Sequence, residues 1–131
     1  MTTKGRVLII DDDPDFSEVV RLALMADGFT VLTAADGEQG LRLMREQKPD
    51  LVFLDIIMVS PTEGAYVSDV MWNDPELMSI PLVIVSSILD SPYAAVFPQD
   101  RYLHMLEFLN KPVSIPKLLE VANKHAGAGT A

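Results

Sequence analysis

The sequence predicts a single α/β domain with a five-stranded parallel sheet covered by helices on both faces. Short apolar runs recur along the chain and alternate with segments of helical periodicity. Strands that alternate with helices need crossover connections, and these produce a parallel, doubly wound sheet. A chain of 131 residues with 49% hydrophobic and 22% charged residues also fits one folded domain. We expect this domain to span residues 1–126 and residues 127–131 to form a flexible tail.

The first three predicted strands are bounded by residues that start or stop helices. The run RVLII ends abruptly at Asp11, as a strand buried on both faces does. Asp13 then supplies a helix cap, Pro14 suits the first helical position, and Gly28 ends the helix. The elements predicted next are a strand at 29–34, a helix from about Gly37 to Gln47 and a strand at 50–54.

The second half of the chain repeats this alternation less regularly. In a helix predicted from about Gly64 to Asn73, helical spacing favours burial of Val67, Val70, Met71 and Trp72 in the core. Between the next strands, Pro92 and Pro98 interrupt any regular helix. The remaining predictions are strands at 81–86 and 107–110 and a helix near 114–126. For five strands of this kind, the common doubly wound order is 2-1-3-4-5.

Composition and charge exclude several classes of function. The chain has no cysteine, so disulfides and thiolate metal sites are excluded. A formal net charge of -9 disfavours direct nucleic-acid binding, whose affinity depends on basic residues. No apolar stretch is long enough for a secretory signal or a membrane span. We therefore expect a cytoplasmic protein whose partners are proteins or cations.

Polar residues follow four of the predicted strands and should meet at one edge of the sheet. They are Asp11, Asp12 and Asp13 after the first strand, Asp55 after the third, Ser86 and Ser87 after the fourth, and Lys111 with Pro112 after the fifth. Crowded carboxylates repel unless a hard cation lies among them, and magnesium is the expected one. A carboxylate beside such a cation can attack phosphorus, while a lysine and a hydroxyl can donate hydrogen bonds to phosphoryl oxygens.

The segments VLIIDDD, DLVFLD, VIVSS and FLNKP resemble the four motif blocks of response regulator receiver domains. The resemblance spans roughly residues 5–125 and implies a signalling domain of a two-component system that is switched by phosphorylation. The implied roles are Asp55 as phosphoacceptor, Asp12 as direct Mg²⁺ ligand, Asp11 as ligand through water, the Ile57 carbonyl as a further ligand, Ser86 and Phe108 as switch residues, and Lys111 as the cation beside the phosphoryl group. Mn²⁺ is an expected substitute for Mg²⁺, and the Lys111-Pro112 bond is a candidate for the cis form.

The resemblance also implies partners. A sensor histidine kinase or a phosphotransfer protein would supply the phosphoryl group, and a downstream protein would bind through region 88–110. The chain would then catalyse only its own phosphorylation and slow dephosphorylation. Within that region, Tyr93, Phe97 and Tyr102 cluster where prolines limit packing, which suggests an unusual partner surface; simple core filling is the alternative.

The sequence departs from the family pattern in two places. The loop after Asp55 carries one extra residue, with its proline at Pro61, and the interval from Ser86 to Lys111 is about three residues longer than is typical of the family. The two positions that help set hydrolysis of the acyl phosphate in this family hold Ile57 and Ile88. Because neither apolar side chain can orient a water molecule, we expect slow self-dephosphorylation.

Three other interpretations remain open at this point. The pair Asp11 and Asp13 resembles the nucleophile and acid of haloacid dehalogenase-type phosphatases. A second alternative is a protein interaction module that has the receiver fold and is recognised by its partner without phosphorylation. A flavodoxin-like cofactor carrier is disfavoured because no Gly- and Ser/Thr-rich phosphate loop follows the first strand. The sequence does not distinguish a stand-alone protein from a fragment of a longer regulator.

Overall fold

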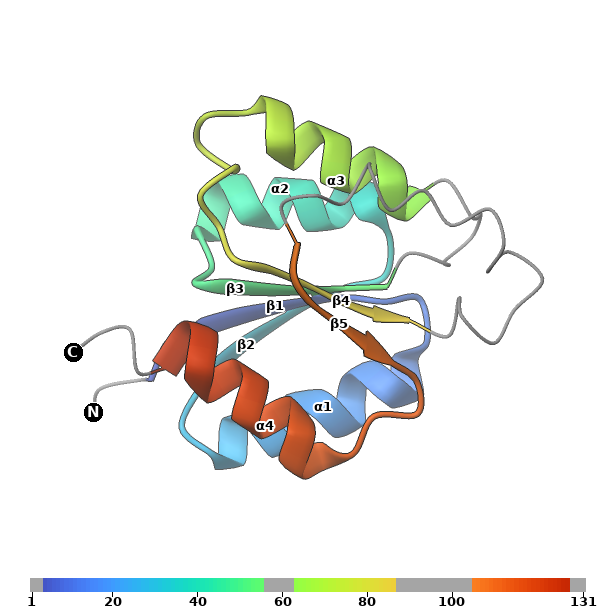
Figure 1. The fold of residues 1–131 in the computed structure, drawn as a ribbon, viewed down its shortest axis with the longest axis vertical. Helices are drawn as coiled ribbons and strands as arrows, with labels where there is room; N and C mark the ends of the chain where they lie inside the picture. The colour runs from blue at the N-terminus through green and yellow to red at the C-terminus, as the bar shows by residue number, and fades with distance from the viewer. Residues whose placement is uncertain (1–3, 56–62, 87–104, 128–131) are drawn as a thin grey trace.

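The computed structural model describes residues 4–55, 63–86 and 105–127, and Figure 1 shows their arrangement. The strands are β1 (Arg6–Ile10), β2 (Thr30–Ala34), β3 (Leu51–Leu54), β4 (Leu82–Ser86) and β5 (Met105–Asn110). The helices are α1 (Pro14–Ala26), α2 (Gly37–Gln47), α3 (Glu63–Asn73) and α4 (Ile115–Ala122), followed by one π-helical turn, Asn123–Gly127. All paired strands are parallel and lie in the order β2-β1-β3-β4-β5, which confirms the predicted fold class.

The sheet has one hydrophobic core on each face. Figure 1 shows α2 and α3 on one side of the sheet and α1 and α4 on the other. Alternate residues of β1 point to opposite faces, so that Leu8 and Ile10 belong to the core beneath α2 and α3, and Val7 and Ile9 belong to the core above α1 and α4. The strands β3 and β4 are buried at every residue and β1 at every residue except Arg6, as their largely apolar sequences predict.

Polar side chains begin three of the helices where the sequence changes from strand to helix. The Asp13 carboxylate accepts hydrogen bonds from the backbone N–H groups of Asp15 and Phe16 and so caps α1. Asp36 caps α2 and Ser114 caps α4 in the same way. These caps fix where each helix starts, and the α1 cap therefore fixes how the chain leaves the end of β1.

A glycine permits close packing of α2 on the sheet. A Cβ atom at Gly40 would lie 2.4 Å from Cδ1 of Ile10 and 2.8 Å from its Cγ1. Contacts this short do not occur without movement of the neighbouring atoms. The Ile10 side chain therefore occupies the space that any larger residue at position 40 would need.

The structure corrects two details of the predicted elements. Trp72 is 51% exposed, so the prediction that it belongs to the core is wrong, whereas Val67 and Met71 are fully buried. Trp72 follows Met71 directly, and one residue turns a helix by about 100°, which carries the indole away from the sheet. Strand β5 also begins two residues before the predicted start at 107, at Met105. No described helix has the length and apolar character that crossing a membrane requires.

Candidate functional site

Backbone hydrogen bonds hold the candidate site residues one position beyond the strands. The N–H of Asp11 donates to the Ala34 carbonyl of β2 at 3.0 Å. The N–H of Asp55 donates to the Ile10 carbonyl of β1 at 2.9 Å, and the Lys111 N–H donates to the Ser86 carbonyl of β4, also at 2.9 Å. The parallel ladders thus continue past the strands, and residues distant in sequence meet at the carboxyl end of the sheet.

Three carboxylates and one lysine form the centre of this site. One carboxylate oxygen from each of Asp11, Asp12 and Asp55 lies within 4.8 Å of the others. Asp11 and Asp55 are buried and Asp12 is exposed. The Lys111 Nζ lies 2.7 Å from Asp11 Oδ2 and 3.3 Å from Asp55 Oδ2. With three carboxylates and one ammonium group, the cluster has a formal net charge of −2.

The electrostatics of Lys111 follow from these contacts. Burial by itself lowers the pKa of Lys111, but the hydrogen bond to Asp11 and the charges of Asp55 and Asp11 outweigh burial and raise that pKa above its usual value. The ammonium also lies 4.2 Å from the centre of the Phe16 ring, a cation–π distance. Lys111 is therefore held as a cation that faces both buried carboxylates.

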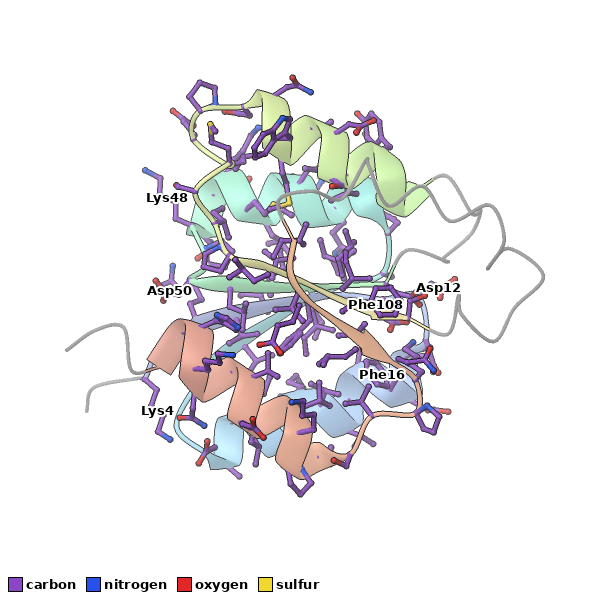
Figure 2. All side chains as sticks on the ribbon, in the orientation of Figure 1. Lys4, Asp12, Phe16, Lys48, Asp50 and Phe108 are labelled. Carbon is purple, nitrogen blue, oxygen red and sulfur yellow. The ribbon has the colours of Figure 1, made fainter. Side chains whose placement is uncertain are left out.

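Phe16 was not among the site residues that the sequence suggested. Its apolar character fits the helical spacing of α1, and that spacing alone indicates only core packing. Figure 2 shows Phe16, Asp12 and Phe108 at the same end of the molecule, opposite Lys4, Lys48 and Asp50. The only sequence signal for its role is its position just after the Asp11–Asp13 run, where the first turn of α1 returns toward the site.

The third aspartate of the run has a structural role. Asp13 Oδ1 accepts hydrogen bonds from two backbone N–H groups of α1, at 3.0 Å and 3.3 Å. Its own backbone N–H donates to Asp11 Oδ1 at 2.9 Å, which helps to orient the Asp11 carboxylate. Because these bonds assign Asp13 to the helix cap, it is a poor candidate for the acid of a dehalogenase-type phosphatase.

The remaining predicted site residues differ in burial, and some of them lie outside the described part of the chain. Ser86 is fully buried, and its Oγ has no hydrogen-bond partner among the described residues. Phe108 is partly buried and packs against the core beneath α2 and α3. The Lys111-Pro112 bond is cis. The described residues do not include five residues named in the sequence analysis: Ile57, Ile88, Tyr93, Phe97 and Tyr102.

The donor set suits a hard divalent cation. Magnesium takes oxygen ligands, binds through one or two carboxylates and keeps several waters. The cluster supplies carboxylate oxygens only, two of them on buried residues and one on an exposed residue that leaves access from solvent. The excess negative charge of the cluster also favours cation binding. On the chemistry of these donors, the residues present fit Mg²⁺.

Comparison with known proteins identifies the family of this chain. The profile of the response regulator receiver domain matches residues 7–123 of this chain. The chain belongs to the response regulator receiver domain family. This assignment confirms the resemblance found in the sequence, and it is consistent with a role in two-component signalling.

Relatives of this receiver domain include proteins of very different length. PilH of Pseudomonas aeruginosa is 33% identical over 121 residues, which cover 91% of this chain and 95% of PilH. The DNA-binding response regulator MtrA of Mycolicibacterium smegmatis is 34% identical over 90 residues, which cover 69% of this chain but only 38% of MtrA. The chain thus spans less than half the length of some relatives that it matches. The structure of the chemotaxis response regulator CheY4 of Vibrio cholerae shares the fold, with a TM-score of 0.78 at 20% identity, over 94% of this chain and 98% of CheY4.

Proposed function

We propose that this receiver domain is switched by phosphorylation of Asp55. The observation that carries the proposal is the grouping of Asp55 with two further carboxylates and the Lys111 ammonium at the carboxyl end of the sheet. Asp11 and Asp55 both belong to the carboxylate cluster and both contact Lys111, and Asp55 is the one that follows β3, the middle strand of the sheet. A carboxylate that faces a cation can act as a nucleophile toward phosphorus.

The reaction would move a phosphoryl group from a histidine of a sensor kinase or phosphotransfer protein to Asp55. An oxygen of the Asp55 carboxylate forms the new O–P bond while the N–P bond of the phosphohistidine breaks. The electron pair of the broken bond stays on the histidine nitrogen. The receiver domain contributes position and charge stabilisation, which dominate catalysis of phosphoryl transfer.

Bound Mg²⁺ would supply positive charge to neutralise the transferring phosphoryl group. Asp12 and Asp55 are the residues proposed to bind it directly, Asp11 the ligand through water, and the Ile57 carbonyl a further ligand. Mn²⁺ is expected to substitute, since it also prefers oxygen ligands. The arrangement of Asp11, Asp12 and Asp55 supports the carboxylate part of this set.

Lys111 and Ser86 are proposed to respond to the phosphoryl group. Lys111 already faces Asp55 Oδ2 at 3.3 Å, within reach of new phosphoryl oxygens. The Ser86 hydroxyl donates to no described acceptor, and an unsatisfied buried hydroxyl gains stability when an acceptor arrives. Movement of Ser86 and of Phe108 on β5 would pass the signal to a downstream protein through region 88–110. We place this signalling in the cytoplasm, where kinases of this kind transfer their phosphoryl group.

The test is a mass measurement on the intact protein. We expect incubation with Mg²⁺ and acetyl phosphate to add the mass of one phosphoryl group, and Asp55→Asn to abolish the addition. Asp15→Asn is the matched control, because Asp15 is an exposed aspartate near the site that is outside the carboxylate cluster. If folded wild-type protein stays unmodified with every phosphodonor, the phosphorylation proposal fails and a module read without phosphorylation is the better interpretation.

A further inference from the structure

Phe16 and Lys111 belong to a closed loop of contacts at the carboxyl end of β1. Lys111 Nζ donates to Asp11 Oδ2 at 2.7 Å and lies over the Phe16 ring, 4.2 Å from its centre. The Phe16 N–H donates to Asp13 Oδ1 at 3.3 Å, and the Asp13 N–H donates to Asp11 Oδ1 at 2.9 Å. A displacement of the Lys111 ammonium therefore changes a contact with the first turn of α1.

The donors of Lys111 are divided among three groups. An ammonium has three N–H donors, and two of these point to Asp11 and Asp55, at 2.7 Å and 3.3 Å. Within the described part of the chain, the Phe16 ring is the third group that faces the ammonium. The Lys111 side chain is only 19% exposed, and cation–π attraction is strongest when the cation is desolvated. The ring packs against the core above α1 and α4, so it is not free to follow the ammonium.

We propose that Phe16 is a positioning residue for Lys111, which holds the ammonium in the unphosphorylated protein and releases it when Asp55 carries a phosphoryl group. The proposal rests on the proposed phosphorylation of Asp55. A phosphoryl group presents three strong acceptor oxygens, and charge-assisted hydrogen bonds to them are stronger than attraction to a neutral ring. The third N–H of Lys111 therefore leaves the ring for a phosphoryl oxygen. Release of the ring carries the change to α1, a helix that the Ser86 and Phe108 switch does not include.

A contact that exists only in the unphosphorylated protein opposes binding of a phosphoryl mimic. Beryllofluoride with Mg²⁺ is such a mimic, and it must break the contact between Lys111 and the ring. Phe16→Leu should therefore bind beryllofluoride about fivefold more tightly than wild type does. Phe16→Trp should bind it more weakly than wild type, because indole attracts cations best. Disturbed packing alone would weaken binding in both variants, so the opposite directions separate positioning from a merely structural role.

The experiment follows the ε-methylene protons of Lys111 by NMR, on the full chain with ¹³C-labelled lysine. Because the ammonium lies over a ring face, these protons should show an upfield ring-current shift relative to those of the exposed Lys117. Phe16→Leu should remove the shift, and so should saturating beryllofluoride with Mg²⁺ in wild type. Lys4 is the matched control, because it lies over the Phe29 ring at 5.6 Å and at the opposite end of the molecule from Phe16 (Figure 2). Its signal should not respond to beryllofluoride.

The outcomes separate this proposal from the proposed function. Equal Lys111 signals in folded wild type and Phe16→Leu would overturn the positioning role. A ring-current shift that persists at saturating beryllofluoride, or affinities that move in the same direction in Phe16→Leu and Phe16→Trp, would overturn the release of the ring. In both cases the gain of one phosphoryl mass from acetyl phosphate would leave the proposed function intact. If wild type neither gains that mass nor binds beryllofluoride, the proposed function fails and this proposal fails with it.

Discussion

Lys111 offers the sharpest test of how the carboxylate cluster is held together. Lys111→Met keeps the length of the side chain but removes the charge that contacts Asp11 and Asp55 at 2.7 Å and 3.3 Å. The side chains of these two aspartates are only 2% and 7% exposed, and that of Lys111 is 19% exposed. Water therefore compensates poorly for the missing cation, and two buried carboxylates remain beside each other without a counter-charge.

The expected loss can be worked out from this burial. Removal of one partner from a fully buried ion pair costs roughly 3–5 kcal/mol. Since part of Lys111 remains exposed, we expect about 3 kcal/mol, a substantial share of a typical domain stability of roughly 5–15 kcal/mol. Lys117→Met is the matched control, because the Lys117–Glu120 pair is 3.6 Å long and largely exposed. Surface pairs of that kind contribute about 0–1 kcal/mol.

Urea unfolding with and without Mg²⁺ measures both effects. In the absence of the cation, Lys111→Met should unfold at a clearly lower urea concentration than Lys117→Met. Added Mg²⁺ should recover more stability in Lys111→Met than in wild type, since the cluster then has a net charge of about −3 instead of −2 for the cation to neutralise. If the two variants unfold within about 0.5 kcal/mol of each other without Mg²⁺, the electrostatic account of the site is refuted.

Three further predictions concern the packing of α2 on the sheet, the decline of Tm at low pH and the lifetime of the phosphorylated protein. Gly40→Ala should lose up to about 2 kcal/mol in urea unfolding, because overpacking against Ile10 at 2.4 Å costs roughly 1–3 kcal/mol and the gain in helix propensity is about 1 kcal/mol. Ile10→Val should reduce this loss. The hydrogen bond with His125 holds the pKa of Glu107 below its usual 4.5. Its stabilisation is therefore present above pH 4.5 and is lost as pH falls through the lowered pKa, so Glu107→Gln should flatten the decline of Tm below pH 4.5. Phosphorylated protein should persist for much longer than seconds in a mass-spectrometric time course, and Ile57→Asn should shorten that lifetime because an amide can orient water.

The sequence predicts most of the architecture because the residues that start or end helices fall between the apolar runs that form the buried strands. The buried strands are uninterrupted apolar runs, and cap residues such as Asp13, Asp36 and Ser114 start helices at the expected places. Parallel strands all end at one edge, so the meeting of Asp11, Asp55 and Lys111 follows from topology without any knowledge of side-chain geometry.

The errors arise where the answer depends on the direction of a side chain. Trp72 lies at a plausible helical spacing from other apolar residues, but the face of α3 that packs on the sheet is defined by Val67 and Met71. Phe16 belongs to the apolar pattern of α1 and also contacts Lys111, and only the position of the first turn reveals the second role. The periodicity of apolar residues identifies which faces of a helix could be buried. The way in which the helix lies across the sheet decides which of these faces is buried.

The charge count of the cluster explains why the site suits a reversible switch. Conversion of the Asp55 carboxylate to an acyl phosphate replaces one negative charge with roughly two at neutral pH. The cluster would then change from about −2 to about −3, and a divalent cation would reduce it to about −1. The Lys111 ammonium has three N–H donors, and two of them already point to Asp11 and Asp55, so it can also donate to a new phosphoryl oxygen. Ser86 offers an additional buried donor. Phosphorylation would therefore redistribute bonds among residues at the ends of β1, β3, β4 and β5, so that a local change of charge acts on four strands at once.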